Sequence, residues 1–145
     1  MSYESTVILS KAKNFKKSGG NKMKKDDLKI AIEKEIKKWS GASIYYYPAW
    51  GCDRMDVAGK MFSLLCQDKG GNDILTVKGI PADNVELRTM FKWIVPGYYT
   101  NKDHWNSILL DEEQWGEEKL LEALKESYNL VVAKLPKKIK MELQL

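Results

Sequence analysis

The sequence predicts an α+β domain of two layers, in which helices cover one face of an antiparallel sheet. Two observations lead to this fold class. Several β-prone segments follow one another in the middle of the chain, and segments with helical periodicity stand near both ends. Strands joined by short turns pair as an antiparallel meander, and helices outside the meander pack on its face. A chain of 145 residues with 43% hydrophobic residues is long enough to bury one core.

We expect residues 1–22 to be a basic, flexible N-terminal extension and residues 23–145 to be a single domain. Residues 18–21 (Ser-Gly-Gly-Asn) are typical of a turn-rich stretch. The first 25 residues hold seven lysines and one acid, so they carry +6, and the remainder carries −2 of the net +4. The basic character therefore comes from the N-terminus, which is either a tail without a dedicated role or an arm that attracts phosphate.

Residues 24–39 are predicted to form the first helix. Apolar side chains recur at spacings of four, four and three, which places them on one helix face: Leu28, Ile32, Ile36 and Trp39. Two aspartates near the start and two lysines near the end complement the helix dipole, and Gly41 can end the helix.

The periodicity then changes to that of strands. Residues 43–47 are β-prone, residues 54–58 alternate, and residues 61–67 form the strongest strand candidate. A turn at residues 68–73, with two glycines, leads to a partner strand at residues 74–78. These segments predict a meander.

A second helix is expected from Pro81 to Phe91, with its buried side supplied by Val85, Leu87, Met90 and Phe91. The segment Val95-Pro96-Gly97 ends it, and a strand follows at residues 106–110.

A last helix is expected from about residue 113 to 132, with Asp111 as its cap and an acidic first turn. Its apolar face comes from Leu120, Leu121, Leu124, Tyr128 and Val131. Residues 134–140 are predicted to form a basic tail, and Trp39 and Trp115 fit helix faces. The expected order of elements is α–β–β–β–α–β–α.

Composition and motifs exclude several classes. No window approaches the roughly 18 consecutive apolar residues that span a bilayer. The N-terminus lacks the charged, apolar and small-residue regions that follow one another in a secretory signal. We therefore expect a cytoplasmic protein without membrane association. One histidine and two cysteines without a CxxC cannot complete a zinc site, so no metal and no cofactor are expected. Cys66, in an apolar run, is expected to be a buried free thiol, and Cys52 to lie in a loop. The Gly59-Lys60 pair predicts a tight bend with an exposed lysine rather than a phosphate loop.

The stretch from Tyr99 to Ile108 is the richest in chemistry, since it holds the sole histidine between two asparagines. His104 can anchor the loop by hydrogen bonds, or contact a ligand together with its neighbours, or act as a general base, although no nucleophile accompanies it. Trp105 can stack on a base or pack into the core, and Trp50 and Trp93, near turns, are further candidates for an exposed ring.

Four segments, taken in order, resemble the MmcQ/YjbR family of small bacterial proteins described as DNA-binding. The similarity covers about residues 24–140, and the matching segments are Val57–Leu65 (VAGKMFSLL), Leu87–Arg88, Pro96–Ile108 (PGYYTNKDHWNSI) and Ser127–Pro136 (SYNLVVAKLP). The resemblance implies a frataxin-like (CyaY-like) α+β fold, which has also been compared with a double-wing DNA-binding architecture. Tyr99 stands where many members have His, and the first helix mixes lysines with acids instead of presenting the acidic ridge of iron-binding frataxins.

The leading hypothesis is therefore a non-enzymatic DNA-binding module, monomeric or weakly dimeric. Its candidate contacts are Lys60, Asn101, Lys102, His104, Asn106, Lys134, Lys137 and Lys138. The C-terminal lysines form either a solvated tail or phosphate contacts. The alternative is a protein-interaction or regulatory domain in which the segment from Asn101 to Asn106 is a structural lock.

Overall fold

The computed structural model describes residues 22–112 and 114–145, so residues 1–21 of the predicted extension lie outside it. Within the described residues the elements run α2 (Lys25–Ile36), β1 (Ala42–Tyr47), β2 (Cys52–Val57), β3 (Lys60–Gln67), β4 (Asp73–Lys78), α3 (Pro81–Met90), β5 (Ile94–Pro96), β6 (Trp105–Leu109), α4 (Glu117–Ala133) and α5 (Lys137–Glu142). The strands form one antiparallel sheet in the order β1-β2-β3-β4-β6-β5.

The α+β class is confirmed, whereas the predicted order of elements is wrong. Four strands precede α3, in agreement with the four β-prone segments between residues 43 and 78, whereas the expected order counted only three, and the predicted basic tail contains the short helix α5. The sequence predicted only the end of a helix near Val95 and Pro96. In the structure these residues belong to the short strand β5, which pairs with β6 and ends at Pro96. Because β5 is the edge strand, a proline without an N–H group is tolerated there.

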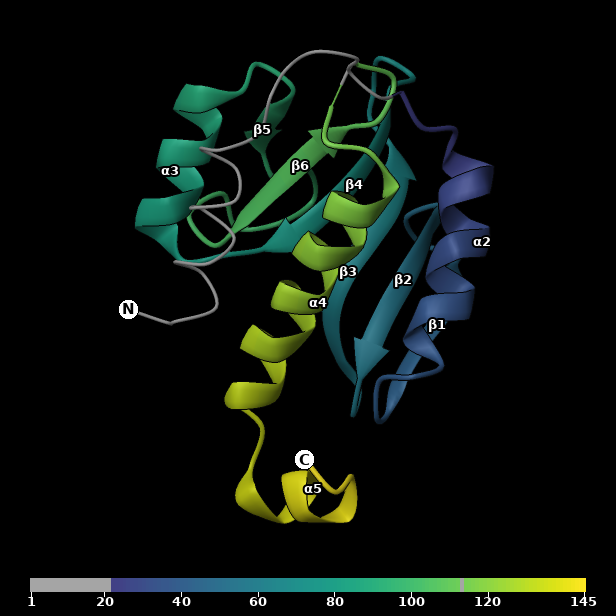
Figure 1. The fold of residues 1–145 in the computed structure, drawn as a ribbon, viewed down its shortest axis with the longest axis vertical. Helices are drawn as coiled ribbons and strands as arrows, with labels where there is room; N and C mark the ends of the chain where they lie inside the picture. The colour runs from purple at the N-terminus through teal and green to yellow at the C-terminus, as the bar shows by residue number, and fades with distance from the viewer. Residues whose placement is uncertain (1–21, 113) are drawn as a thin grey trace.

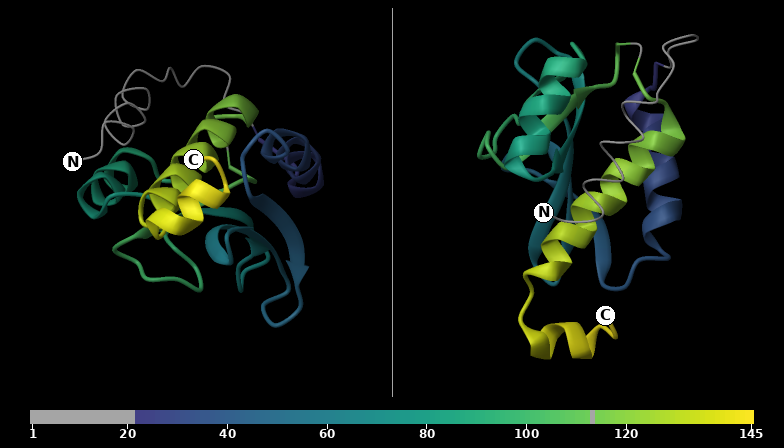
Figure 2. Two further views of the ribbon diagram at one scale, coloured as in Figure 1. Left: turned by 90° about the horizontal axis from the view of Figure 1, so that it is seen from below. Right: turned by 60° about the vertical axis from the view of Figure 1, so that its left-hand side comes forward.

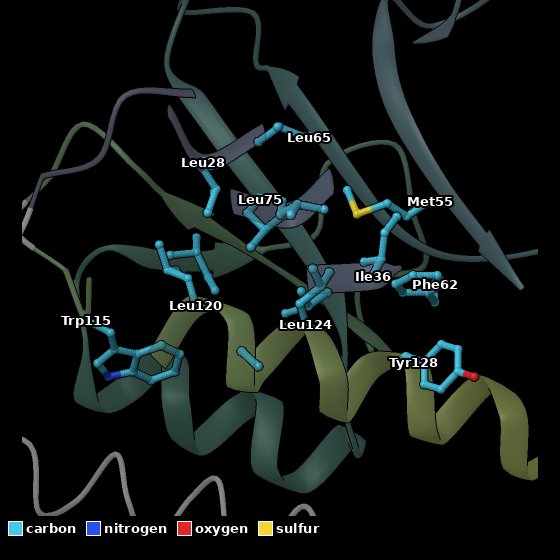
Figure 3. Packing of buried hydrophobic residues seen from close by; sticks show 14 of the residues in the cluster. Leu28, Ile36, Met55, Phe62, Leu65, Leu75, Trp115, Leu120, Leu124 and Tyr128 are labelled. Atoms are coloured by element: carbon cyan, nitrogen blue, oxygen red, sulfur yellow. The ribbon is translucent and has the colours of Figure 1, made fainter. Parts of the chain in front are cut away.

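The helices α2, α4 and α3 lie side by side on one face of the sheet (Figures 1 and 2). Helix α4 crosses β3 and β4, α2 packs beside it near β1, and α3 covers β5 and β6. Between the helices and the sheet lies the main core, shown in Figure 3, to which α2, the strands and α4 all contribute: Leu28, Ile36, Met55, Phe62, Leu65, Leu75, Leu120, Leu124 and Tyr128. The opposite face of the sheet carries no helix in the described residues, and we call it the open face.

Three predictions about the helices need correction. Helix α4 begins at Glu117 because Gly116, with φ of 91°, precedes it, and Asp111 does not cap it but accepts a hydrogen bond from the Asp73 N–H. Trp115 lies before the helix and packs between aromatic rings of the core. Val85 is 54% exposed, because only one side of α3 contacts the sheet.

The chain after α2 is fixed by tertiary contacts. Helix α2 ends at Ile36, yet Trp39 is buried three residues later and packs against Phe62 and Tyr128. The Tyr128 hydroxyl donates to the Ser40 carbonyl, and the Ser40 hydroxyl donates to the carbonyl of Leu143. These bonds fasten α5 beneath α4 and against the loop that leads into β1 (Figure 1).

The predicted buried free thiol at Cys66 is wrong, since Cys52 and Cys66 form a disulfide with a Cα–Cα distance of 4.6 Å. Cys52 begins β2 instead of lying in a loop, and the β2–β3 register places the two cysteines opposite each other. Both residues are 1% exposed. Within the described residues, none of the helices has both the length and the hydropathy needed to cross a membrane.

Candidate functional site

The loop between β5 and β6 holds most of the residues that the sequence singled out, and its backbone folds back on β6. The Gly97 N–H donates to the Trp105 carbonyl (2.9 Å), and the Trp105 N–H donates to the Asn101 carbonyl (3.1 Å). The Tyr98 N–H donates to the Ser107 hydroxyl (3.0 Å), which faces the open side of the sheet. The loop therefore passes over the open face before the chain enters β6.

Asn101 and Lys102 both make bonds within this loop. The Asn101 side-chain oxygen accepts from the N–H groups of Asp103 (2.9 Å) and His104 (3.3 Å), which is an Asx turn. The Lys102 ammonium donates to the Gly97 carbonyl, although the residue remains exposed. His104 is half-buried, and its carbonyl accepts from the Gly79 N–H.

Asn106 is placed differently, because it is only 2% exposed. Its side-chain oxygen accepts a 2.6 Å hydrogen bond from Arg88, and its amide nitrogen donates to the Asn84 carbonyl (3.2 Å). Asn84 in turn donates to the carbonyl of Asp103 (3.1 Å). The amide of Asn106 thus connects α3 to the loop from the inside, while Asn101 and Lys102 remain at the surface.

A pocket lies between α3, α4 and the sheet, lined by residues that include Asn84, Leu87, Asn106 and Trp115. His104 is not among its lining residues. In the part of the chain that the structure describes, no three histidine, cysteine, aspartate or glutamate residues gather as metal ligands would. Neither observation gives His104 a catalytic setting.

The remaining predicted residues are four lysines, and they lie at one end of the molecule together with Lys78, which the sequence did not single out; we call this the basic end. Lys60 follows the tight turn between β2 and β3, where Ala58 and Gly59 both have positive φ. Lys78 ends β4, Lys134 follows the end of α4, and the first turn of α5 supplies Lys137 and Lys138. Antiparallel topology brings these termini to the same end of the sheet (Figure 1).

Electrostatic coupling supports this proximity. Burial lowers the pKa of Lys78, and the positive charge of Lys134 lowers it further. Lys60, Lys134, Lys137 and Lys138 are exposed, so their charges face solvent.

Sequence reasoning missed a strip of aromatic rings across the open face, which we call the aromatic strip: Tyr45, Tyr47, Trp50 and Tyr99. Successive ring centroids lie 6.5, 5.0 and 5.8 Å apart, and the Trp50 and Tyr99 rings are parallel within 9°. A signal was present, because side chains two residues apart on a strand share a face. Ile44 packs into the core, so Tyr45 and Tyr47 face away from the helices.

The strip rests on a second, smaller apolar cluster. Tyr98 and parts of β3 and β4 pack around the disulfide in this cluster. The Arg54 guanidinium lies 5.2 Å from the centre of the Tyr47 ring and donates to Asp56 (2.7 Å). The Tyr45 hydroxyl donates to the same carboxylate (2.7 Å), and this hydrogen bond raises the pKa of Tyr45.

Comparison with known proteins finds relatives of this chain in sequence and in fold. The model of the YjbR family matches residues 42–130. The uncharacterized protein YbdF of Escherichia coli O157:H7 is 33% identical over 86 residues, which are 59% of this chain and 69% of that protein. The crystal structure of Deinococcus radiodurans protein DR2400, described as a DUF419 domain, superposes with a TM-score of 0.68 at 27% identity, covering 79% of this chain and 86% of that one.

A protein from Pseudomonas syringae shares the fold, with a TM-score of 0.57 and 21% identity over 70% of this chain and 96% of that one. The family match spans β1 through most of α4, and it therefore includes the loop between β5 and β6, the aromatic strip and Lys60. The chain belongs to the YjbR family.

Proposed function

We propose that this protein is a cytoplasmic, non-enzymatic DNA-binding module that contacts the phosphate backbone through its basic end. The observation that carries the proposal is the convergence of five lysines from β3, β4, α4 and α5: Lys60, Lys78, Lys134, Lys137 and Lys138. Lysines that release counterions from phosphate supply most of the affinity of sequence-independent DNA binding.

The charge pattern supports this proposal more directly than the overall pI does. Like charges brought close together destabilise each other, and the charge of Lys134 adds to burial in lowering the pKa of Lys78. A polyanion relieves that repulsion, so DNA is a fitting ligand for such an end.

In this proposal the loop between β5 and β6 has two roles. Lys102 and Asn101 are exposed and His104 is half-buried, so they are candidate contacts to DNA. Asn106 holds the loop through Arg88 and Asn84. The same network favours the alternative function, a protein-interaction or regulatory domain in which this loop is purely structural.

We also propose that the domain is frataxin-like (CyaY-like). The supporting features are the single antiparallel sheet and the packing of α2 and α4 together on one of its faces. The finding that would reject this class is a different strand order when an experimental structure is compared with a frataxin.

The test of DNA binding is a titration of labelled duplex DNA at several salt concentrations, with the full chain and with a chain that begins at Met23. We expect both to bind at low salt, with a steep loss of affinity as salt rises. Binding by the full chain alone would assign the affinity to the N-terminal lysines, and absence of binding by both would reject the proposal.

A triple variant locates the DNA-binding surface. Replacing Lys134, Lys137 and Lys138 by glutamine should weaken duplex binding and reduce the salt slope by about 0.9 for each phosphate that a lysine no longer neutralises. The matched control replaces three exposed lysines at the opposite end of the sheet that belong neither to the basic end nor to the aromatic strip, Lys22, Lys24 and Lys92. Equally weakened binding in both variants would show that only net charge matters, and the basic end would not be the DNA site.

A further inference from the structure

We propose that the aromatic strip on the open face binds the unpaired bases of a single-stranded nucleic acid. This inference rests on the proposed function in its ligand class, and it uses aromatic rings on a different surface, with Lys102 as the one residue that both proposals share. The strip is formed by β1, the turn after it, and the loop between β5 and β6.

Exposure is the first argument. Tyr45 is 42% exposed, Trp50 is 36% exposed and Tyr99 is 47% exposed, although each ring contacts the next. Contiguous exposed apolar surface on a soluble domain marks a binding site more often than chance placement. The parallel pair of Trp50 and Tyr99 presents flat ring faces of the kind on which a base stacks.

The backbone of Tyr99 is the second argument. Its φ is 67°, in the left-handed region that a bulky side chain rarely adopts. The surrounding loop holds this conformation through the Tyr98–Ser107 and Asn101 hydrogen bonds, and the ring then lies on Trp50. Conformational strain of this kind concentrates at ligand sites.

Charge is the third argument, and it selects nucleic acid over other ligands of aromatic surfaces. Two exposed lysines flank the strip: Lys102 is in the same loop as Tyr99, and the backbone of Lys69 hydrogen-bonds Tyr98. Two of the nearby carboxylates are engaged within the chain, and that of Asp103, beside Lys102, is exposed. Asp56 accepts from Tyr45 and Arg54, and Asp68 accepts from the N–H groups of its own turn. Cations beside stacked rings match a ligand that alternates bases with phosphates.

The bases must be unpaired, because the faces of bases in a duplex are covered by their neighbours. Sheets that display aromatic side chains bind single strands by stacking two or three bases on the exposed rings. A base stacked on Trp50 or Tyr99 would leave its phosphates within the field of Lys69 and Lys102. Trp50 and Lys69 lie at the end of the strands opposite the basic end, whereas the loop that carries Tyr99 and Lys102 joins β6 beside Lys78, which pairs with Trp105.

The test compares a ten-nucleotide deoxythymidine strand with an abasic strand of equal length and charge, using the full-length protein. Tryptophan fluorescence is a useful readout, because Trp50 is exposed while Trp39, Trp93 and Trp115 are buried. Trp105 is half-buried, and the Trp50→Phe variant separates the signal of Trp50 from that of Trp105. We expect the deoxythymidine strand to quench this emission and to bind at least about fivefold more tightly than the abasic strand.

Variants identify the rings involved. Trp50→Ala and Tyr99→Asn should each weaken binding of the deoxythymidine strand about fivefold or more, and Trp50→Phe should retain most of it. Asparagine tolerates positive φ, so Tyr99→Asn removes the ring without further strain on the loop. Tyr46→Ala is the matched control, because Tyr46 is 61% exposed on the same strand but faces the other side of the sheet.

The outcomes separate this proposal from the proposed function. Equal affinity for the two strands, unchanged binding by Trp50→Ala and Tyr99→Asn, or equally weakened binding by Tyr46→Ala would overturn it. Self-association that Trp50→Ala abolishes, without binding of the deoxythymidine strand, would instead make the strip an interface between copies of this chain. The variant with glutamine at Lys134, Lys137 and Lys138 should lose duplex binding and keep its preference for the deoxythymidine over the abasic strand, so either proposal can fail alone.

Discussion

Arg88 and Asn106 are joined by a 2.6 Å hydrogen bond that links the last turn of α3 to the start of β6. Because Asn106 is 2% exposed, its amide has left water and needs these protein partners. Its other side-chain atom donates to the carbonyl of Asn84, so both polar ends are satisfied from α3. The loop before β6 therefore has its position determined from inside the domain.

A double-mutant cycle on this pair should give a coupling energy of about 1–3 kcal/mol in the free energy of unfolding, since each single change leaves a polar partner unpaired. The variants are Arg88→Met, Asn106→Ala and the double variant, measured by urea unfolding. The exposed ion pair between Lys38 and Glu35, 3.1 Å apart, is the control and should give a coupling below about 0.5 kcal/mol. Similar couplings for the two pairs would contradict an internal lock.

Reduction of the disulfide should destabilise the domain. The bond closes a loop with a sequence separation of 14, and a loop of this size restricts the unfolded chain by about 3 kcal/mol. We expect urea unfolding with a phosphine reductant to show a lower free energy of unfolding than unfolding without it. The Cys52→Ala, Cys66→Ala double variant, in which the reductant should change nothing, is the control. Two reactive thiols in non-reduced, denatured protein would refute the bond.

Local periodicity predicted most elements because helices and strands with one buried face repeat their apolar residues. It failed where pairing or tertiary contact decides the structure. The three residues of β5 are too few to show alternation, and they form a strand only because β6 lies beside them. Helix α5 is held by Ser40, about a hundred residues away in the chain.

The candidate site shows the same division between local and long-range information. The basic lysines and the composition of the loop are visible in the sequence, but the burial of Asn106 depends on Arg88, eighteen residues earlier. The disulfide had an indirect signal, since the turn at Ala58 and Gly59 lies midway between the two cysteines. The contact of Trp50 with Tyr99 had none, because it depends on the path of a loop.

The hairpin turn between β3 and β4 should be sensitive to pH through Asp68. Burial alone would raise the pKa of Asp68, but hydrogen bonds from Asn72 and Gly70 to its carboxylate outweigh burial and lower it. A carboxylate with a depressed folded-state pKa stabilises the fold above its unfolded pKa, about 3.9, and loses this contribution as pH falls through the folded value.

Replacing Asp68 by asparagine, which resembles the protonated acid, should therefore lower the urea midpoint at pH 7. The difference from wild type should shrink as the pH falls below about 4. Urea unfolding of both proteins at pH 7 and pH 3 measures this. A difference of equal size at both pH values would assign the effect to shape instead of charge.

Gly97 is the position in the loop where a single methyl group should have the largest effect. Its φ lies outside the left-handed region, so backbone strain plays no part, but an added Cβ would overlap the Thr100 hydroxyl and lie 2.7 Å from the Cβ of Trp105. The Trp105 carbonyl, 3.0 Å away, accepts the Gly97 N–H bond and cannot move without losing it. Overpacking of this kind costs about 1–3 kcal/mol.

We therefore expect Gly97→Ala to lower the free energy of unfolding by about 1–3 kcal/mol, and to weaken single-strand binding because the loop carries Tyr99. Gly70→Ala is the control. Gly70 also lies outside the left-handed region, and its added Cβ would meet only side-chain atoms of an exposed turn, the nearest 3.3 Å away. Thermal unfolding measures the stability of both variants. Equal stability of the two would mean that the loop has room to move away from β6. The close approach at Gly97 would then not fix the position of Tyr99.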